Sequence, residues 1–156
     1  MAERLKDMGL KVTYPGLPEH PDHELFGELH CPDYGFGGLL TLDMGTEEAA
    51  NQLMDMLQND YHFGYMAVSL GYFDTLMSCS GSTTSSEMTE EDKQEAGISP
   101  GLLRMSLGYT GTTEQRWNQL LKALERLGTV GEVVGTGLAD GVTGAASSAP
   151  VKHGAY

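Results

Sequence analysis

The segment 112–128 carries the pattern that most limits how this chain can fold. Thr112 and Gln115 have the spacing of a helix capping box, and Gly128 is placed to end the same helix. Between them, one apolar stripe recurs every three or four positions; it comprises Trp117, Leu120, Leu121, Leu124 and Leu127. A helix with a single apolar face must pack against another layer, so this segment predicts a layered fold rather than an isolated helix.

The rest of the chain alternates short strand patterns with helix patterns. We expect further helices at 2–8, 47–58 and about 89–96, and strands at 11–14, 38–42, 66–70 and 102–107. We also expect a rigid proline-rich connection at 15–23, one helical turn at 72–77 and a loop at 78–86. Thr46 is well placed to cap the 47–58 helix. Short connections between helices and strands predict an α+β fold, with a small, mainly antiparallel sheet that helices cover on one face.

Composition divides the chain into two parts. Residues 1–127 hold the strand and helix patterns and form the predicted domain. Residues 128–156 contain seven glycines among 29 residues, with Ala, Ser, Thr and Val between them and almost no charge. We expect a flexible tail there, although Val133, Val134 and Leu138 leave a weakly apolar docking arm as the alternative.

The chain is strongly acidic, with 9 Lys+Arg against 22 Asp+Glu and a formal net charge of −13 at pH 7. Such a charge repels nucleic acid and anionic membrane surfaces, so neither is an expected partner. No window approaches the run of about 18 apolar residues that a membrane span needs, and residues 1–16 lack the apolar stretch of a secretory signal. Cys31 and Cys79 fit no metal or disulfide pattern, which favours reduced thiols and a cytoplasmic protein, with an organelle as the open alternative.

One arginine is the first candidate for chemistry. Leu103, Met105 and Leu107 share one face of the 102–107 strand, and Arg104 lies on the opposite face. A guanidinium held on a rigid strand is a good two-pronged clamp for a carboxylate. An arginine on a solvated sheet face has the same spacing, and spacing alone favours this simpler interpretation.

Other reactive residues form no recognisable site. His20 and His23 have the spacing of a helical metal pair, but prolines on either side of His20 oppose a helix and no further ligands complete a set. The serine-rich loop lacks a Gly-x-Ser-x-Gly turn, and the glycines at 35–38 precede a strand instead of following one. The residues alone therefore predict one acidic α+β domain with a candidate anion clamp and no metal site.

Four segments, taken in order, resemble one known family. They are VTYPGLPEHPDHELF at 12–26, GFGGLLTLDMGT at 35–46, FGYMAVSLGYFDTLMSCSGSTTSSE at 63–87 and AGISPGLLRMSLGYTGTTEQRW at 96–117. Together they are similar to the C-terminal domain of the transsulfuration-type pyridoxal-phosphate enzymes of cysteine and methionine metabolism, over about residues 2–127. Within this family the resemblance is closest to the methionine γ-lyases of plants and algae. It implies the C-terminal domain of a fold-type I enzyme, with pyridoxal phosphate as cofactor.

The resemblance assigns roles to four residues. The family's carboxylate-binding arginine lies in a Leu-x-Arg-x-Ser-x-Gly pattern, which spans 102–108 here, so Arg104 takes its place. The family's Ser-Leu-Gly serine, which lies beside the cofactor and the substrate carboxylate, matches Ser69. Val68 resembles the valine that precedes it in methionine γ-lyases and suits a thioether side chain. Thr84 matches a substrate-binding threonine, although the family's neighbouring His-Pro and Met-Thr-His patterns are replaced here.

The family's cofactor lysine has no match in this chain. None of the five lysines follows the Ser-x-Thr pattern of the Schiff-base lysine; they are Lys6, Lys11, Lys93, Lys122 and Lys152. The resemblance begins inside the helix that ends the family's large domain, which leaves open whether Met1 is the natural start.

Two interpretations follow from the resemblance. The first is the substrate-carboxylate-binding domain of a methionine γ-lyase-like carbon–sulfur lyase, which performs α,γ-elimination of methionine or a related thioether. Such a domain would be inactive without a large cofactor domain, in cis or in trans, and homotetrameric when complete. The alternative is a non-catalytic domain kept as a structural or docking subunit of a larger assembly.

Overall fold

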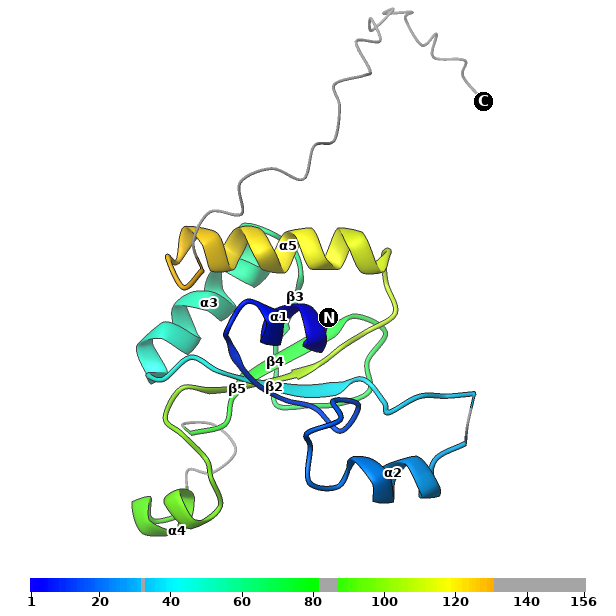
Figure 1. Cartoon of the computed structure of the whole chain (residues 1–156). Helices are drawn as coiled ribbons and strands as arrows, with labels where there is room; N and C mark the ends of the chain where they lie inside the picture. Colours follow the sequence, from blue (N-terminus) through cyan, green and yellow to red (C-terminus); the bar gives the residue numbers. More distant parts are fainter. Residues whose placement is uncertain (32, 82–86, 131–156) are drawn as a thin grey trace, which may run out of the picture.

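A single five-stranded sheet organises the molecule. The computed structural model describes residues 1–31, 33–81 and 87–130 (Figure 1). The strands lie in the order β1-β2-β5-β4-β3. Their bounds are β1 Lys11–Thr13, β2 Leu39–Asp43, β3 Gly64–Met66, β4 Thr75–Cys79 and β5 Leu102–Ser106. Every pair of neighbours is antiparallel except β3 and β4, which run parallel, so the prediction of a mainly antiparallel sheet is confirmed.

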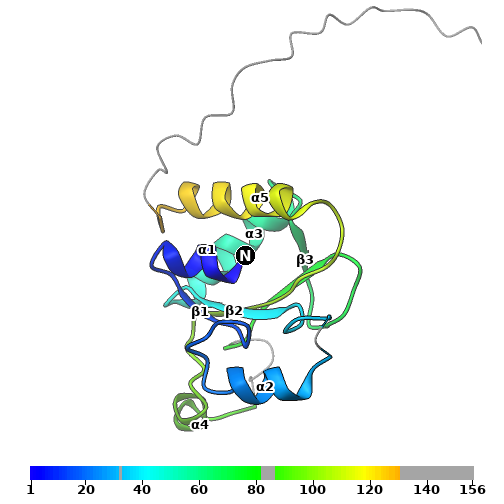
Figure 2. The same cartoon turned by 45° about the vertical axis from the view of Figure 1, so that its right-hand side comes forward.

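The helices lie in two unequal groups. Helices α1 (Ala2–Asp7), α3 (Glu47–Asn59) and α5 (Thr113–Arg126) lie together on one side of the sheet (Figures 1 and 2). The short helices α2 (His23–Leu29) and α4 (Glu90–Glu95) lie on the other side. Helix α2 has no buried residue, so it adds little to the core. The predicted α+β fold is therefore confirmed. The three helices that bury side chains against the sheet all cover the same face of it.

The core lies between the sheet and the covering helices. Leu103 and Met105 of β5 are fully buried in this core, on the sheet face that the helices cover, as their alternation predicts. The stripes of α3 and α5 meet them; the buried helix residues are Ala50, Leu53, Met54, Leu57, Trp117, Leu120, Ala123 and Leu124. Burying such apolar side chains is worth about 1.5–3 kcal/mol each, so this layer supplies most of the driving force for folding.

Local capping signals position the two long helices. The Thr112 hydroxyl accepts a hydrogen bond from the Gln115 backbone N–H at 3.1 Å, and the Thr46 hydroxyl accepts one from the Ala49 N–H at 3.2 Å. Gly128 follows α5 with a φ of 73°, the left-handed conformation that ends helices. Thr46 and Thr112 are confirmed as N-caps and Gly128 as the stop; of the predicted capping box at α5, the bond to Thr112 is formed and the return bond from the Gln115 side chain is not.

Three sequence predictions were wrong around the sheet edge. The strand predicted at 66–70 is β3, which ends at Met66; Ala67 N–H still donates to the Met77 carbonyl at 2.9 Å, and then the chain leaves the sheet. The second half of the helical turn predicted at 72–77, and the first two residues of the loop predicted at 78–86, instead form β4; residues 82–86 of that loop lie outside the described residues. All five residues of β4 are buried, so this inner strand shows no alternation that a sequence pattern could reveal.

Helix α2 was not predicted. Its N-cap residue, Asp22, makes no side-chain cap bond, and Gly27 interrupts its middle, so local signals for a helix are weak. Tertiary ring contacts stabilise it instead, because Phe36 stacks on His23 and His30 with centroid distances of 4.8 and 4.9 Å.

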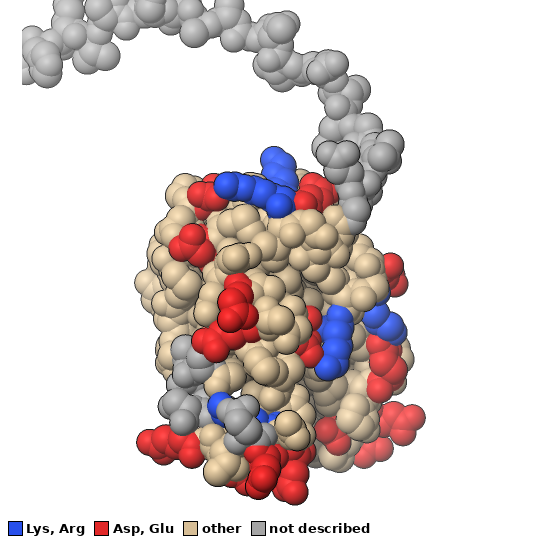
Figure 3. Space-filling model, turned by 90° about the vertical axis from the view of Figure 1, so that its left-hand side faces the viewer, with Lys and Arg blue, Asp and Glu red and all other residues tan. Residues whose placement is uncertain are grey.

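The surface carries the acidic excess of the sequence. Acidic groups are more widespread than basic ones on the face in Figure 3, and they gather at its lower end, where α2 and α4 lie in Figure 1. In the part of the chain that the structure describes, no helix is long and apolar enough to cross a membrane.

Candidate functional site

The candidate site lies on the polar face of β5. Arg104 alternates with the buried Leu103 and Met105, so its side chain lies on the sheet face opposite the covering helices. In the register of the sheet, Arg104 stands between Thr41 of β2 and Ser78 of β4. Residues directly opposite in neighbouring strands share a face, so these three side chains form one row.

A loop from the edge of the sheet reaches this row. The Arg104 Nη2 atom donates a hydrogen bond to the Ser69 carbonyl oxygen at 3.2 Å. Two residues along β5, the Ser106 hydroxyl accepts a bond from the Gly71 N–H at 3.2 Å. Strand β5 thus holds the Ser-Leu-Gly segment at both ends, and the first bond joins Arg104 and Ser69, the two residues that the family resemblance selected.

Ser106 is a contact that sequence reasoning did not single out. The signal was present, because Ser106 shares the alternating face of Arg104 and lies in the same Leu-x-Arg-x-Ser-x-Gly pattern. Its partner Gly71 has a φ of 71°, which suits glycine, so the turn after Ser69 is built for this bond.

A mostly apolar cavity of about 330 Å³ opens beside Ser69. It is lined by Tyr65, Ala67, Ser69, Tyr72 and Leu76. Val68 is not among these lining residues, and 62% of it is exposed. Thr84 lies outside the described residues. The structure therefore brings Arg104 and Ser69 together and leaves Val68 on the open surface next to them.

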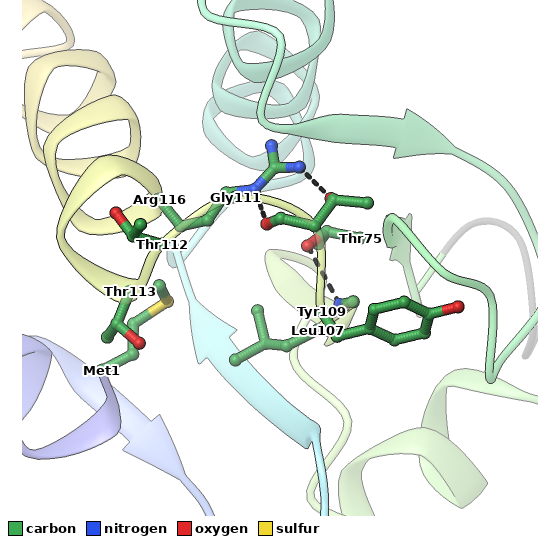
Figure 4. A pocket seen from close by; sticks show the side chains of 10 residues that line it. Met1, Thr75, Leu107, Tyr109, Gly111, Thr112, Thr113 and Arg116 are labelled. Atoms are coloured by element: carbon green, nitrogen blue, oxygen red, sulfur yellow. Dashed lines mark hydrogen bonds between the residues drawn. The ribbon is translucent and has the colours of Figure 1, made fainter.

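A larger cavity of about 410 Å³ lies at the start of α5 (Figure 4). Among the described residues that line it, Arg116 is the one with a charged side chain. Its Nη2 pairs with Asp74 at 2.7 Å, and its Nε donates to the Thr110 carbonyl at 2.9 Å. A guanidinium neutralised in this way has little attraction left for an anionic ligand. We therefore place the candidate site at Arg104, although the cavity beside Ser69 is smaller.

The described residues fit a carboxylate better than they fit a cofactor. No described lysine lines the cavity beside Ser69. Lys6 pairs with Glu19, and Lys11 pairs with Asp43 at 2.7 Å. Within the residues that the structure covers, no three His, Cys, Asp or Glu side chains gather in a way that could hold a metal ion. Cys79 is buried in β4 with its Sγ donating to the Pro100 carbonyl, so it presents no exposed thiol here.

The fold, with an arginine beside the Ser-Leu-Gly segment, is of the kind found in fold-type I pyridoxal-phosphate enzymes. The structure is similar to that of cystathionine gamma synthase from Xanthomonas oryzae pv. oryzae in complex with aminoacrylate and cysteine. The TM-score is 0.70 and the sequence identity is 33%, over 82% of this chain and 32% of that one. The chain belongs to the family described as Cys/Met metabolism PLP-dependent enzyme, whose family model matches residues 3–125.

Curated relatives agree with this assignment. The chain is 62% identical to methionine gamma-lyase of Arabidopsis thaliana over 126 residues, which is 81% of this chain and 29% of the relative. It is 35% identical to cystathionine gamma-lyase of Bacillus subtilis over 116 residues, or 74% of this chain and 28% of the relative. The chain thus spans less than a third of the length of these relatives. The family assignment of the sequence analysis is confirmed, and so is pyridoxal phosphate as the family's cofactor.

Proposed function

We propose that this chain is the substrate-carboxylate-binding domain of a carbon–sulfur lyase that acts on methionine or a related thioether by α,γ-elimination. One observation carries the proposal most directly, the hydrogen bond between Arg104 Nη2 and the Ser69 carbonyl. It links the arginine on the rigid strand to the loop that, in the family pattern, lies beside the cofactor. The 62% identity to a methionine gamma-lyase supports the choice of a thioether substrate.

Each residue of the site has a definite task in this proposal. Arg104 holds the α-carboxylate, because a guanidinium offers two parallel N–H donors that match the two carboxylate oxygens. Ser69 positions the backbone loop and the amino-acid end of the substrate. Val68, whose side chain is exposed here, forms an apolar wall for the thioether once another surface closes over it. Thr84 is the further substrate contact that the family pattern suggests.

The chemistry of the reaction requires a second structural unit. Pyridoxal phosphate supplies an electron sink for the carbanion, but it needs a lysine amine and a phosphate site. None of the chain's five lysines follows the family's Schiff-base pattern. We therefore propose that a large cofactor domain, in cis or in trans, completes the site, and that the complete enzyme is oligomeric and cytoplasmic. In this proposal residues 1–127 are the domain and residues 128–156 are a tail.

The surface beside Ser69 is suited to such a unit. A run of apolar side chains stands exposed on β3 and on the loop that joins it to β4; it comprises Tyr65, Met66, Val68, Leu70, Tyr72 and Phe73. Large exposed apolar patches usually mark contact surfaces. The run lies where a cofactor domain would have to come close to Arg104.

Two activity measurements test the proposal. The purified chain, with added pyridoxal phosphate and L-methionine, should release no methanethiol or 2-oxobutanoate above a no-protein control. Addition of the remaining part of the Arabidopsis methionine gamma-lyase, without its own C-terminal part, should restore release, and Arg104→Lys should abolish the restoration. Turnover by the chain alone would refute the proposed need for a partner.

The alternative is a structural or docking subunit without a catalytic role. The same exposed apolar run favours it, because such a surface suits any complementary partner. Co-purification from the native source separates the two proposals. A partner chain that carries the family's Schiff-base lysine supports the enzyme, whereas unrelated subunits support the docking role.

A further inference from the structure

Ser78 occupies a special place next to the candidate clamp. It lies on the inner strand β4, directly opposite Arg104 in the register of β4 and β5. Only 3% of Ser78 is exposed, so its hydroxyl depends on protein or ligand partners rather than on bulk solvent. Neither the sequence pattern nor the comparisons give this serine a role.

Two buried polar atoms in this row lack partners. Within the described chain, the Ser78 hydroxyl oxygen and the Arg104 Nε atom are the buried side-chain atoms without a hydrogen bond. An unmade hydrogen bond at a buried polar group costs about 1–3 kcal/mol, so two on facing residues call for an explanation. Arg116 provides a contrast, because its Nε and both Nη atoms are all bonded.

The two unpartnered groups are chemically complementary. The guanidinium Nε–H can only donate, and a serine oxygen can accept through two lone pairs. In the present arrangement Nη2 is bonded to the Ser69 carbonyl, which draws one prong of the guanidinium toward the loop. A bond from Nε–H to Ser78 would satisfy both buried atoms and would leave the two Nη groups free for a carboxylate.

We propose that Ser78 is a positioning residue for Arg104. When a substrate carboxylate binds, Arg104 releases the Ser69 carbonyl, its Nε–H donates to the Ser78 hydroxyl oxygen, and both Nη groups donate to the carboxylate. The serine is suited to this task because it is fixed on an inner strand of the sheet. This inference rests on the proposed function, since it concerns how the same clamp is held.

The effect of Ser78 should fall on carboxylate binding. Ser78→Ala removes the acceptor without adding volume. Loss of one hydrogen bond from a charged donor should weaken carboxylate binding about tenfold. Ser78→Thr keeps the hydroxyl and should keep most of the affinity. Thr41→Val is the matched control, because Thr41 flanks Arg104 on the other side and the change removes a hydroxyl at nearly constant volume. It should leave the affinity within about twofold.

Nuclear magnetic resonance of the full chain provides the readout. The sequence contains four arginines, so the Nε–Hε signal of Arg104 can be assigned by its disappearance in Arg104→Lys. Titration with L-methionine should move this signal downfield in the wild type, in Ser78→Thr and in Thr41→Val. In Ser78→Ala the signal should stay in place while binding weakens about tenfold. L-Methioninol, which lacks the carboxylate, should move it in none of them.

The possible outcomes distinguish failure of the Ser78 role from failure of the Arg104 carboxylate clamp. If Ser78→Ala binds L-methionine as tightly as the wild type, with the same shift of the Arg104 signal, the role of Ser78 is overturned while the clamp stands. If L-methionine moves no Arg104 signal in the wild type, the carboxylate clamp itself is overturned, and the role of Ser78 fails with it. If Ser78→Ala changes the backbone signals throughout the sheet, Ser78→Thr decides, because a positioning role requires its rescue.

Discussion

Arg116 of α5 and Asp74, the residue before β4, form an ion pair with an Nη2–Oδ1 distance of 2.7 Å. Both side chains are nearly buried, at 13% and 15% exposure. Arg116 also donates to the carbonyl oxygens of Thr110 and Phe63, each at 2.9 Å. One guanidinium therefore ties the covering helix to both ends of the segment that carries Ser69, so the core layer and the site depend on each other.

Loss of this ion pair should destabilise the domain strongly. Removing one partner of a buried, hydrogen-bonded pair costs about 3–5 kcal/mol, because the other charge stays buried. We expect Arg116→Ala to lower the free energy of unfolding by about this amount in urea denaturation. Arg126→Ala is the control, since Arg126 forms an exposed pair with Asp60 that is worth at most about 1 kcal/mol. Equal losses in the two variants would contradict a special role for Arg116.

Two glycines should respond to alanine in opposite ways. A Cβ atom at Gly108 would lie 2.4 Å from the Phe73 carbonyl oxygen, which is backbone and cannot move aside. Gly108→Ala should therefore destabilise the domain by about 3 kcal/mol through overpacking.

Within the described chain, no atom beyond the local helix backbone lies within 4 Å of a methyl group added at Gly27, inside α2. Gly27→Ala should therefore stabilise α2 by about 0.5–1 kcal/mol. Thermal unfolding of both variants checks the signs; a loss of stability in Gly27→Ala would contradict the open surroundings of that residue.

Asp43 should make stability depend on pH. Burial acts to raise the pKa of its carboxyl, but hydrogen bonds from Lys11, Ser99 and the Gly45 N–H outweigh it and hold the pKa below its ordinary value of 3.8. A folded-state pKa below the unfolded one stabilises the fold above the unfolded pKa, and this contribution is lost as the pH falls through the folded pKa.

Asp43→Asn measures that contribution. At about pH 6 the variant should be less stable than the wild type by about 1–3 kcal/mol, and the gap should narrow as the pH falls below about 4. Asp33→Asn, at an exposed position, should show a small gap at both pH values. A gap for Asp43→Asn that widens in acid would contradict the direction of the pKa shift.

The sequence predicted the parts of the fold that local signals determine. The stripes and caps of α3 and α5 and the alternation of β5 each have a period or a cap that is written in a short segment. Strand β4 has neither, because both of its faces are buried and small residues such as Ser78 replace the usual β-branched ones. Helix α2 depends on the ring of Phe36, which only the tertiary fold brings to it.

The candidate site also combines residues that the sequence predicted with contacts that only the folded structure shows. Alternation placed Arg104 on the polar face of β5, and the family resemblance selected Ser69. The contact between them spans 35 residues, and so does the bond from Gly71 to Ser106. Both contacts require the loop after β3 to fold back over β5. Such long-range contacts leave no periodic trace in a sequence, which is why the place of Ser78 beside Arg104 emerges only from the register of the strands and the bond of Ser106 to Gly71 only from the folded loop.

Ser106 should control the mobility of the Ser-Leu-Gly segment. Its hydroxyl accepts the Gly71 N–H, so Ser106→Ala should expose this amide and raise its hydrogen-exchange rate about fivefold, as loss of a hydrogen bond of about 1 kcal/mol predicts. Ser99→Ala is the matched control, because Ser99 donates to Asp43 at 2.5 Å, and Asp43 pairs with Leu102 at the opposite end of β5 from Ser106. It should lower global stability without a selective effect on Gly71. An unchanged Gly71 rate in Ser106→Ala would contradict a role for Ser106 in holding the segment against β5.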